Sequence, residues 1–275
     1  MNKKFRKEIN ILRLGLPLMG IVFLTLLATP LYATKVDLNR EKVESGLLQA
    51  MISNYQETKK FKVCVEKGET KYYYSVRNRP QENLPLQMGA GSYTVTTLEN
   101  VSGNQYKIVS KTTLSMENKS PTDVYKNSIQ IVDWQLTMKC ILKAKELTKD
   151  AKTDMEKFNA LYAFMVNNFV YDYDKIPTLT ADYLPDNETT FTVKKGICYD
   201  YSSLFGAMLR SVGIPAKLCM GYTTYLGNEY HAWNEVYLDG KWQSVDTTSD
   251  AVYVKAKKKT DTFKTADKMK KTKEY

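Results

Sequence analysis

The sequence predicts an α+β protein in which a β-rich region precedes a part built from helices and an antiparallel sheet. Short runs of β-branched and aromatic residues, separated by turn signals, occupy residues 47–116. Helical periodicity replaces this pattern after Pro121, and strand-like runs return beyond residue 215. A chain of 275 residues is ample for one or two hydrophobic cores.

Residues 1–33 have the three parts of a secretory signal peptide. A basic stretch is followed by the apolar run 18–28, and Ala33 offers a small residue for cleavage. The run is shorter than the roughly 20 residues that a membrane-spanning helix needs. We therefore expect a secreted or cell-surface protein. An uncleaved N-terminal membrane anchor is the alternative, because Leu31 is a mediocre residue for a cleavage site.

The net charge of +10 resides at the two ends of the chain. Residues 1–13 carry a net +4 and residues 255–275 a net +6, so residues 14–254 are neutral. A nucleic-acid-binding protein needs its basic surface on the folded body, so we expect no nucleic-acid partner. The Lys-rich tail, residues 255–275, is expected to be a solvated end.

Residues 34–120 are expected to form a small sandwich of antiparallel strands, with a polar linker at residues 34–45. Its role, as a partner-binding module or as a brace, stays open. The strand-like runs are 61–65, 71–76, 92–98 and 105–109.

Residues 121–254 are predicted to form the second part. A loosely patterned helix lies near residues 136–147, and a capping box at Thr153–Glu156 starts a clearer one. A long polar connection covers residues 171–195, and connections of that length are often functional. A helix is then expected from about Tyr199 to Val212. Three strands follow it, 216–222, 231–237 and 242–245, with a hairpin turn at Asp239-Gly240.

Cys198, His231 and Asp246 are the candidate catalytic residues. Cys198 stands at a predicted helix N-terminus, where the helix dipole and free amides favour a thiolate and its own amide can donate to an oxyanion. His231 is the one histidine of the chain. Asp246 follows the neighbouring strand, from which it can orient the imidazole. Each residue alone also has a structural explanation: a buried small hydrophobe, a packing residue or a turn residue.

Three segments resemble, in order, the motifs of the transglutaminase-like superfamily. They are Gly196-Ile-Cys-Tyr-Asp-Tyr-Ser-Ser-Leu-Phe, His231-Ala-Trp-Asn-Glu-Val-Tyr and Val245-Asp-Thr-Thr, the last in place of the commoner Asp-Pro-Thr. Gly221-Tyr222 and the segment Tyr171-Asp172-Tyr173 add to the likeness, which covers roughly residues 135–250. A weaker likeness links Pro85–Tyr93 to segments that accompany this domain in exported bacterial proteins.

The resemblance implies a papain-like transglutaminase core with Cys198 as nucleophile, His231 as base and acid, and Asp246 as orienter. Such enzymes act on amide carbonyls through a thioester. We therefore expect an exported protease, amidase or transglutaminase whose partner is a protein or peptide substrate, including substrates associated with the cell wall. The alternative is a non-catalytic binding or structural module at the cell surface, against which the intact triad argues.

The remaining cysteines and the lone histidine bear on cofactors. With no CxxC pair and one histidine, we expect neither a metal site nor another cofactor. Cys219 is expected in the core, whereas Cys64 and Cys140 could form a disulfide or remain free thiols. The sequence distinguishes neither hydrolysis from transamidation nor a second oxyanion donor.

Residues 1–33 should be absent from the mature protein if they are a signal peptide. N-terminal sequencing of the exported form should therefore start near Thr34. An exported chain that still begins at Met1 would contradict this prediction and favour the anchor.

Overall fold

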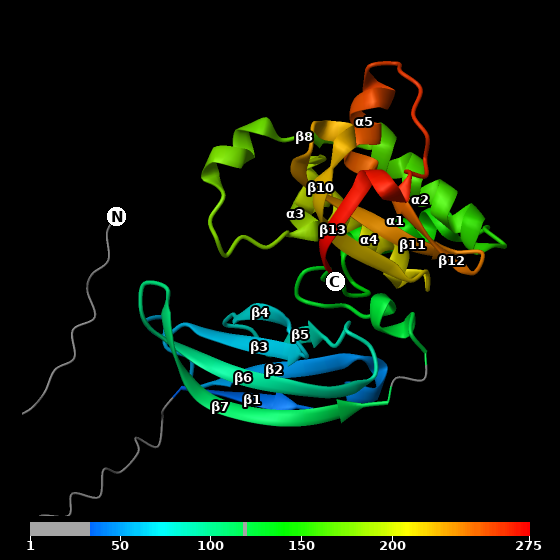
Figure 1. Ribbon diagram of the computed structural model, residues 1–275. Helices are drawn as coiled ribbons and strands as arrows, with labels where there is room; N and C mark the ends of the chain where they lie inside the picture. The colour runs from blue at the N-terminus through cyan, green and yellow to red at the C-terminus, as the bar shows by residue number, and fades with distance from the viewer. Residues whose placement is uncertain (1–33, 118–119) are drawn as a thin grey trace, which may run out of the picture. The chain divides into compact units, whose positions relative to one another are not determined.

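A computed structural model describes residues 34–117 and 120–275 of the chain (Figure 1). The predicted signal peptide, residues 1–33, lies outside the described residues and is not tested by the structure. Within the described ranges, no helix combines the length and the hydropathy that a membrane span requires.

The β-rich region forms two antiparallel sheets, with strand orders β1-β2-β5 and β4-β3-β6-β7. Side chains alternate between buried and exposed along β4, and buried side chains of both sheets join one apolar cluster. This confirms the predicted sheet region. The strands are β1 (Lys35–Asn39), β2 (Leu47–Ser53), β3 (Phe61–Lys67), β4 (Thr70–Val76), β5 (Glu82–Pro85), β6 (Gly91–Ser102) and β7 (Gln105–Met116).

The prediction of a linker at residues 34–45 is wrong for residues 35–39, which form strand β1. Strand β1 pairs with β2 along its whole length, with Leu38 opposite Ala50. Val36 and Leu38 pack against the apolar core from this edge strand. The strand was missed because only these two of its five residues are apolar, and they alternate with Lys35, Asp37 and Asn39.

The second part combines helices with a four-stranded antiparallel sheet, which confirms the predicted α+β class. In the described chain its α-helices are α1 (Lys139–Thr148), α2 (Asp154–Asn168), α3 (Asn187–Val193), α4 (Cys198–Ser211) and α5 (Thr247–Lys255). The capping box of α2 is present: the Thr153 hydroxyl accepts from the Glu156 amide, and the Glu156 carboxylate accepts from the Thr153 amide. Helix α4 is buried along most of its length and packs against β10, β11 and the other helices.

The sheet of this part has the strand order β12-β11-β10-β13. Asp239 and Gly240, with φ values of 50° and 79°, form the predicted hairpin turn between β11 and β12. A short parallel pair, β8 (Val170–Tyr171) with β9 (Lys195–Gly196), leads into α4. The long strands are β10 (Ala216–Thr223), β11 (Glu229–Leu238), β12 (Lys241–Val245) and β13 (Met269–Glu274).

The prediction of a solvated tail at residues 255–275 is wrong for residues 269–274. They form the edge strand β13 beside β10 (Figure 1). Met269 is buried with Cys219 and Trp233 beneath it. The sequence did not predict this strand because its lysines suggested a solvated segment. In the structure the lysine side chains face solvent or acidic partners, and Lys271 Nζ lies 2.7 Å from a Glu235 oxygen. Lysines on an edge strand also disfavour pairing with further strands.

The close approach of β13 depends on a glycine in β10. A Cβ added at Gly221 would lie 2.1 Å from the backbone oxygen of Lys270, closer than any contact permits. The absence of a side chain therefore allows β13 to pair here, at a bulge between Met220 and Gly221.

All four cysteines are free thiols in the structure. Of the two possibilities for Cys64 and Cys140, the structure holds both as buried free thiols. Cys219 is fully buried, as expected.

Gly221→Ala should detach β13 from β10, because the new methyl group overlaps the Lys270 carbonyl. We expect destabilisation of about 1–3 kcal/mol, the usual range for overpacking. Cys219 should then react with a thiol reagent under native conditions, which quantitative labelling would measure. Lys273→Ala, an exposed change on the same strand, is the control. Unchanged protection of Cys219 in Gly221→Ala would contradict the prediction.

Candidate active site

The N-terminus of α4 holds Cys198 in a fixed backbone conformation. Cys198 is the first residue of the helix and is half-buried. The Asp200 carboxylate turns back and accepts a hydrogen bond of 2.9 Å from the Ile197 amide. A Cβ at Gly196 would lie 2.7 Å from the Asp200 Cβ. Glycine is therefore needed two residues before the thiol so that Asp200 can cap the helix.

His231 and Asp246 meet on one face of the β11–β12 hairpin. Asn234 pairs with Val245, so the register places Trp233 opposite Asp246. His231 lies two residues further along β11, on the same face, where diagonal neighbours come within reach. The structure brings the two side chains together: His231 Nε2 lies 2.9 Å from Asp246 Oδ2, and both residues are buried.

Asp246 is also the N-cap of α5. Its Oδ1 accepts hydrogen bonds of 3.1 Å from the amides of Thr248 and Ser249, and its Oδ2 accepts one of 2.6 Å from the Ser249 hydroxyl. These donors hold the carboxylate in the orientation that faces His231. The capping bonds thus anchor the imidazole as well as the helix.

The His231 imidazole is held in its charged form. Burial acts to lower its pKa, but hydrogen bonds with Asp246 and then with Cys198 outweigh burial and raise it to about 10. For Asp246, burial acts to raise the pKa, and the bonds from His231 and Ser249 hold it below the usual range. Because Nε2 faces Asp246, the other ring nitrogen, Nδ1, is left for the Cys198 thiol.

Cys198 and His231 open into a shared cavity of about 380 Å³. Its walls come from the connection after α2, the start of β11 and helix α5, and they are rich in tyrosine. Glu229 is the acidic residue among those that line it. The other lining residues are Tyr171, Tyr173, Ile176, Leu226, Tyr230, Thr248, Ser249, Val252 and Tyr253.

Tyr171 is a site residue to which the sequence assigned no role. The β8–β9 pair sets it opposite Gly196, two residues before Cys198. Burial and the nearby Cys198 charge raise the Tyr171 pKa to about 12, while a hydrogen bond with the Cys198 backbone acts to lower it. Its hydroxyl is thus a protonated donor beside the thiol. The sequence pointed to this position only through the segment Tyr171-Asp172-Tyr173, which resembles the transglutaminase-like superfamily.

The connection at residues 171–195 is fastened to α4 by charged groups. Lys175 Nζ lies 2.7 Å from Asp200 Oδ2, and the Tyr183 hydroxyl bonds to Asp200 Oδ1. Lys195 Nζ lies 3.0 Å from Asp172 and 2.8 Å from Asp174. The Asp200 carboxylate, which caps α4, therefore also holds the cavity wall next to that helix.

Comparison with known proteins agrees with this geometry. Residues 143–247 match the family model of the transglutaminase-like superfamily, and the chain carries a domain of that superfamily. Kyphoscoliosis peptidase of Mus musculus is 28% identical over 125 residues, 42% of this chain and 19% of that protein. Uncharacterized protein YebA of Bacillus subtilis (strain 168) is 27% identical over 177 residues, 58% of this chain and 23% of that protein.

This chain therefore spans only about a fifth of the length of these curated relatives. Among solved structures, the periplasmic domain of TgpA from Pseudomonas aeruginosa is 15% identical, with a TM-score of 0.39. The match covers 81% of this chain and 96% of that one. Within the described residues, no group of three His, Cys, Asp or Glu side chains is placed to hold a metal ion.

The raised pKa of His231 predicts a pH-dependent contribution to stability. An unfolded histidine titrates near 6.5, whereas folded His231 titrates near 10. The bonds of the imidazolium therefore stabilise the fold fully below about pH 6.5, and their contribution is lost as the pH rises through about 10. The difference in free energy of unfolding between wild type and His231→Gln should shrink from pH 6 to pH 10 in urea titrations. A difference that stays constant or grows would contradict the ion pair.

Proposed function

We propose that this protein is an exported thiol enzyme that acts on amide bonds of proteins or peptides through a thioester on Cys198. The observation that carries the proposal is the His231 imidazole, which is bonded 2.9 Å from Asp246 and interacts with Cys198 at one cavity. A nucleophile, a proton carrier and an orienter in this order are the parts that thioester chemistry needs.

In the first step the Cys198 sulfur attacks the carbonyl carbon of the substrate amide. The carbonyl oxygen gains the negative charge, and the Tyr171 hydroxyl is a donor for it. The Cys198 amide at the start of α4 is a second donor once it exchanges its bond with Tyr171 for one with the substrate. His231 Nδ1 then gives its proton to the departing nitrogen as the carbon–nitrogen bond breaks. An acyl thioester and a free amine or ammonia result.

In the second step the thioester is released. His231 removes a proton from water or from an amine, whose oxygen or nitrogen attacks the thioester carbon while sulfur leaves as thiolate. Water gives hydrolysis and an amine gives transamidation. Asp246 stays ionised throughout and holds the imidazole by Nε2.

The place of action follows from the proposed signal peptide. An exported enzyme meets surface proteins and cell-wall peptides, and these are the proposed substrates. Exposed lysines of the segment after α5, among them Lys257, Lys258 and Lys259, give the folded protein a basic surface that favours acidic surroundings.

Thiol alkylation at pH 6 tests the proposed nucleophile. An ordinary thiol is only about 0.3% ionised at this pH. The imidazolium beside Cys198 should make it react with iodoacetamide much faster, by about one to two orders of magnitude. His231→Gln should remove this advantage. Asp246→Asn should reduce it less, because asparagine still caps α5 while the imidazole loses its charged partner.

Cys198→Ala and the buried Cys219 supply the controls: the labelled peptide should disappear in the first, and Cys219 should stay unlabelled in all variants. If Cys198 reacts at pH 6 no faster than Cys64 or Cys140, the proposal fails and the non-catalytic module is the better description. Incubation with a glutamine-containing protein and a labelled primary amine then separates the two reactions. Incorporated label indicates transamidation, and new N-termini indicate proteolysis.

A further inference from the structure

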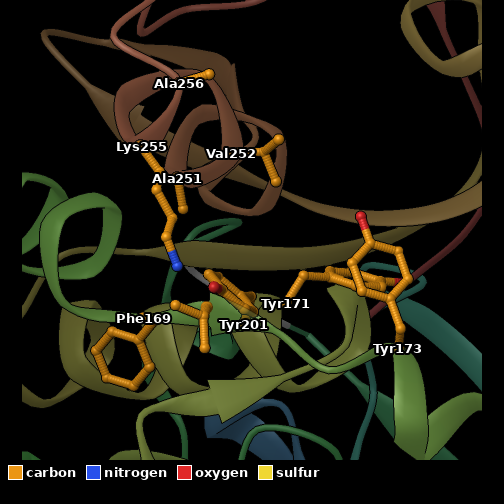
Figure 2. A pocket seen from close by; sticks show the side chains of 9 residues that line it. Phe169, Tyr171, Tyr173, Tyr201, Ala251, Val252, Lys255 and Ala256 are labelled. Carbon is orange, nitrogen blue, oxygen red and sulfur yellow. The ribbon is translucent and has the colours of Figure 1, made fainter.

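A second cavity, whose lining side chains are drawn in Figure 2, shares two tyrosines with the cavity of the proposed active site. Its volume is about 320 Å³, near the lower end for small-molecule sites. Tyr171, Tyr173 and Val252 line both cavities, so the second one borders the wall beside Cys198. Phe169 and Val170 supply further apolar surface.

Two polar groups in this cavity lack partners. The Tyr201 side chain is fully buried, and within the described residues its hydroxyl has no hydrogen-bond partner. Lys255, an exposed residue at the end of α5, makes no ion pair or hydrogen bond through its ammonium group with any residue the structure describes. Figure 2 shows the Lys255 side chain reaching from α5 toward the Tyr201 hydroxyl.

A buried hydroxyl without a partner is unfavourable, because it has given up its bonds to water. It is better satisfied by an acceptor that enters the cavity. The ammonium of Lys255 favours a negatively charged acceptor, and no acidic side chain lines the cavity. The surrounding aromatic and aliphatic side chains favour an apolar group behind that charge.

We propose that this cavity binds a carboxylate attached to an apolar body. One carboxylate oxygen accepts from the Lys255 ammonium and the other from the Tyr201 hydroxyl. The apolar body packs against Phe169, Val170 and Val252. The site is built by α5, β8 and α4, and of the groups assigned to the proposed chemistry Tyr171 also lines it.

Such a carboxylate has two sources. It can be a free organic acid, or it can be the carboxylate of a peptide whose amide lies at Cys198 across the tyrosine wall. The second source rests on the proposed function. The charges agree with a dipolar peptide, since Glu229 lines the active-site cavity and Lys255 the second one.

Benzoate is the probe, and the full chain with Cys198→Ala is the protein, so that binding is measured without catalysis. Calorimetric titration should show saturable binding of benzoate but not of benzamide or inorganic phosphate. Adding Lys255→Met should weaken binding about tenfold or more, as expected for a charge-assisted bond. Adding Tyr201→Phe should weaken it about threefold or more, and this variant should melt at or above the temperature of its parent.

Lys258→Met removes the same charge from a neighbouring lysine that does not line the cavity, and it should leave binding unchanged. A peptide that displaces benzoate only when its C-terminus is a free carboxylate, rather than an amide, identifies the substrate as the source. Displacement by free acids alone identifies the other source. The proposal is overturned if benzamide binds as well as benzoate, or if Lys255→Met and Lys258→Met bind it equally. Neither result depends on whether Cys198 is catalytic.

Discussion

One buried carboxylate, Asp246, holds the candidate site together. It is 2% exposed and takes hydrogen bonds from His231, from two amides of α5 and from the Ser249 hydroxyl. A buried charge is tolerated only when its hydrogen-bonding capacity is filled. The end of β12, the start of α5 and the start of β11 must therefore keep one arrangement. The position of the imidazole follows from this requirement, as does the cavity wall that α5 provides.

A second buried carboxylate, Asp200, fixes the helix that carries Cys198. Asp200 is fully buried, caps α4 through the Ile197 amide and binds Lys175. Cys198 and His231 thus stand on separate elements, each fixed by its own aspartate. Because α4 packs against β11, these two fixed elements also lie against each other. Such rigid support is what places a thiol and an imidazole within reach without help from a flexible loop.

Local patterns in the sequence were enough to predict the elements that carry Cys198, His231 and Asp246. Helix α4 begins and ends within one residue of the prediction, and the Asp-Gly turn set the hairpin register that brings His231 near Asp246. What was missed depends on long-range partners. Strand β13 is half lysine and pairs with β10 beside Gly221, and Tyr171 acquires a role only through its pairing with β9. Helix α5 was not predicted, because it starts with Thr-Thr-Ser and shows no apolar stripe. The capping residue Asp246 was the main indication in the sequence that a helix begins there.

The segment after Asp246 has consequences for specificity. The family model ends at residue 247, the first residue of α5, so the rest of α5 and all of β13 lie beyond it. Yet Ser249 and Val252 line the active-site cavity, while Ala251 and Lys255 line the second one. The groups expected to perform the chemistry lie within the shared domain, whereas much of the surface that a substrate would contact comes from a segment outside the match. Relatives that share the triad motifs but differ after the aspartate should therefore share the reaction and differ in what they accept.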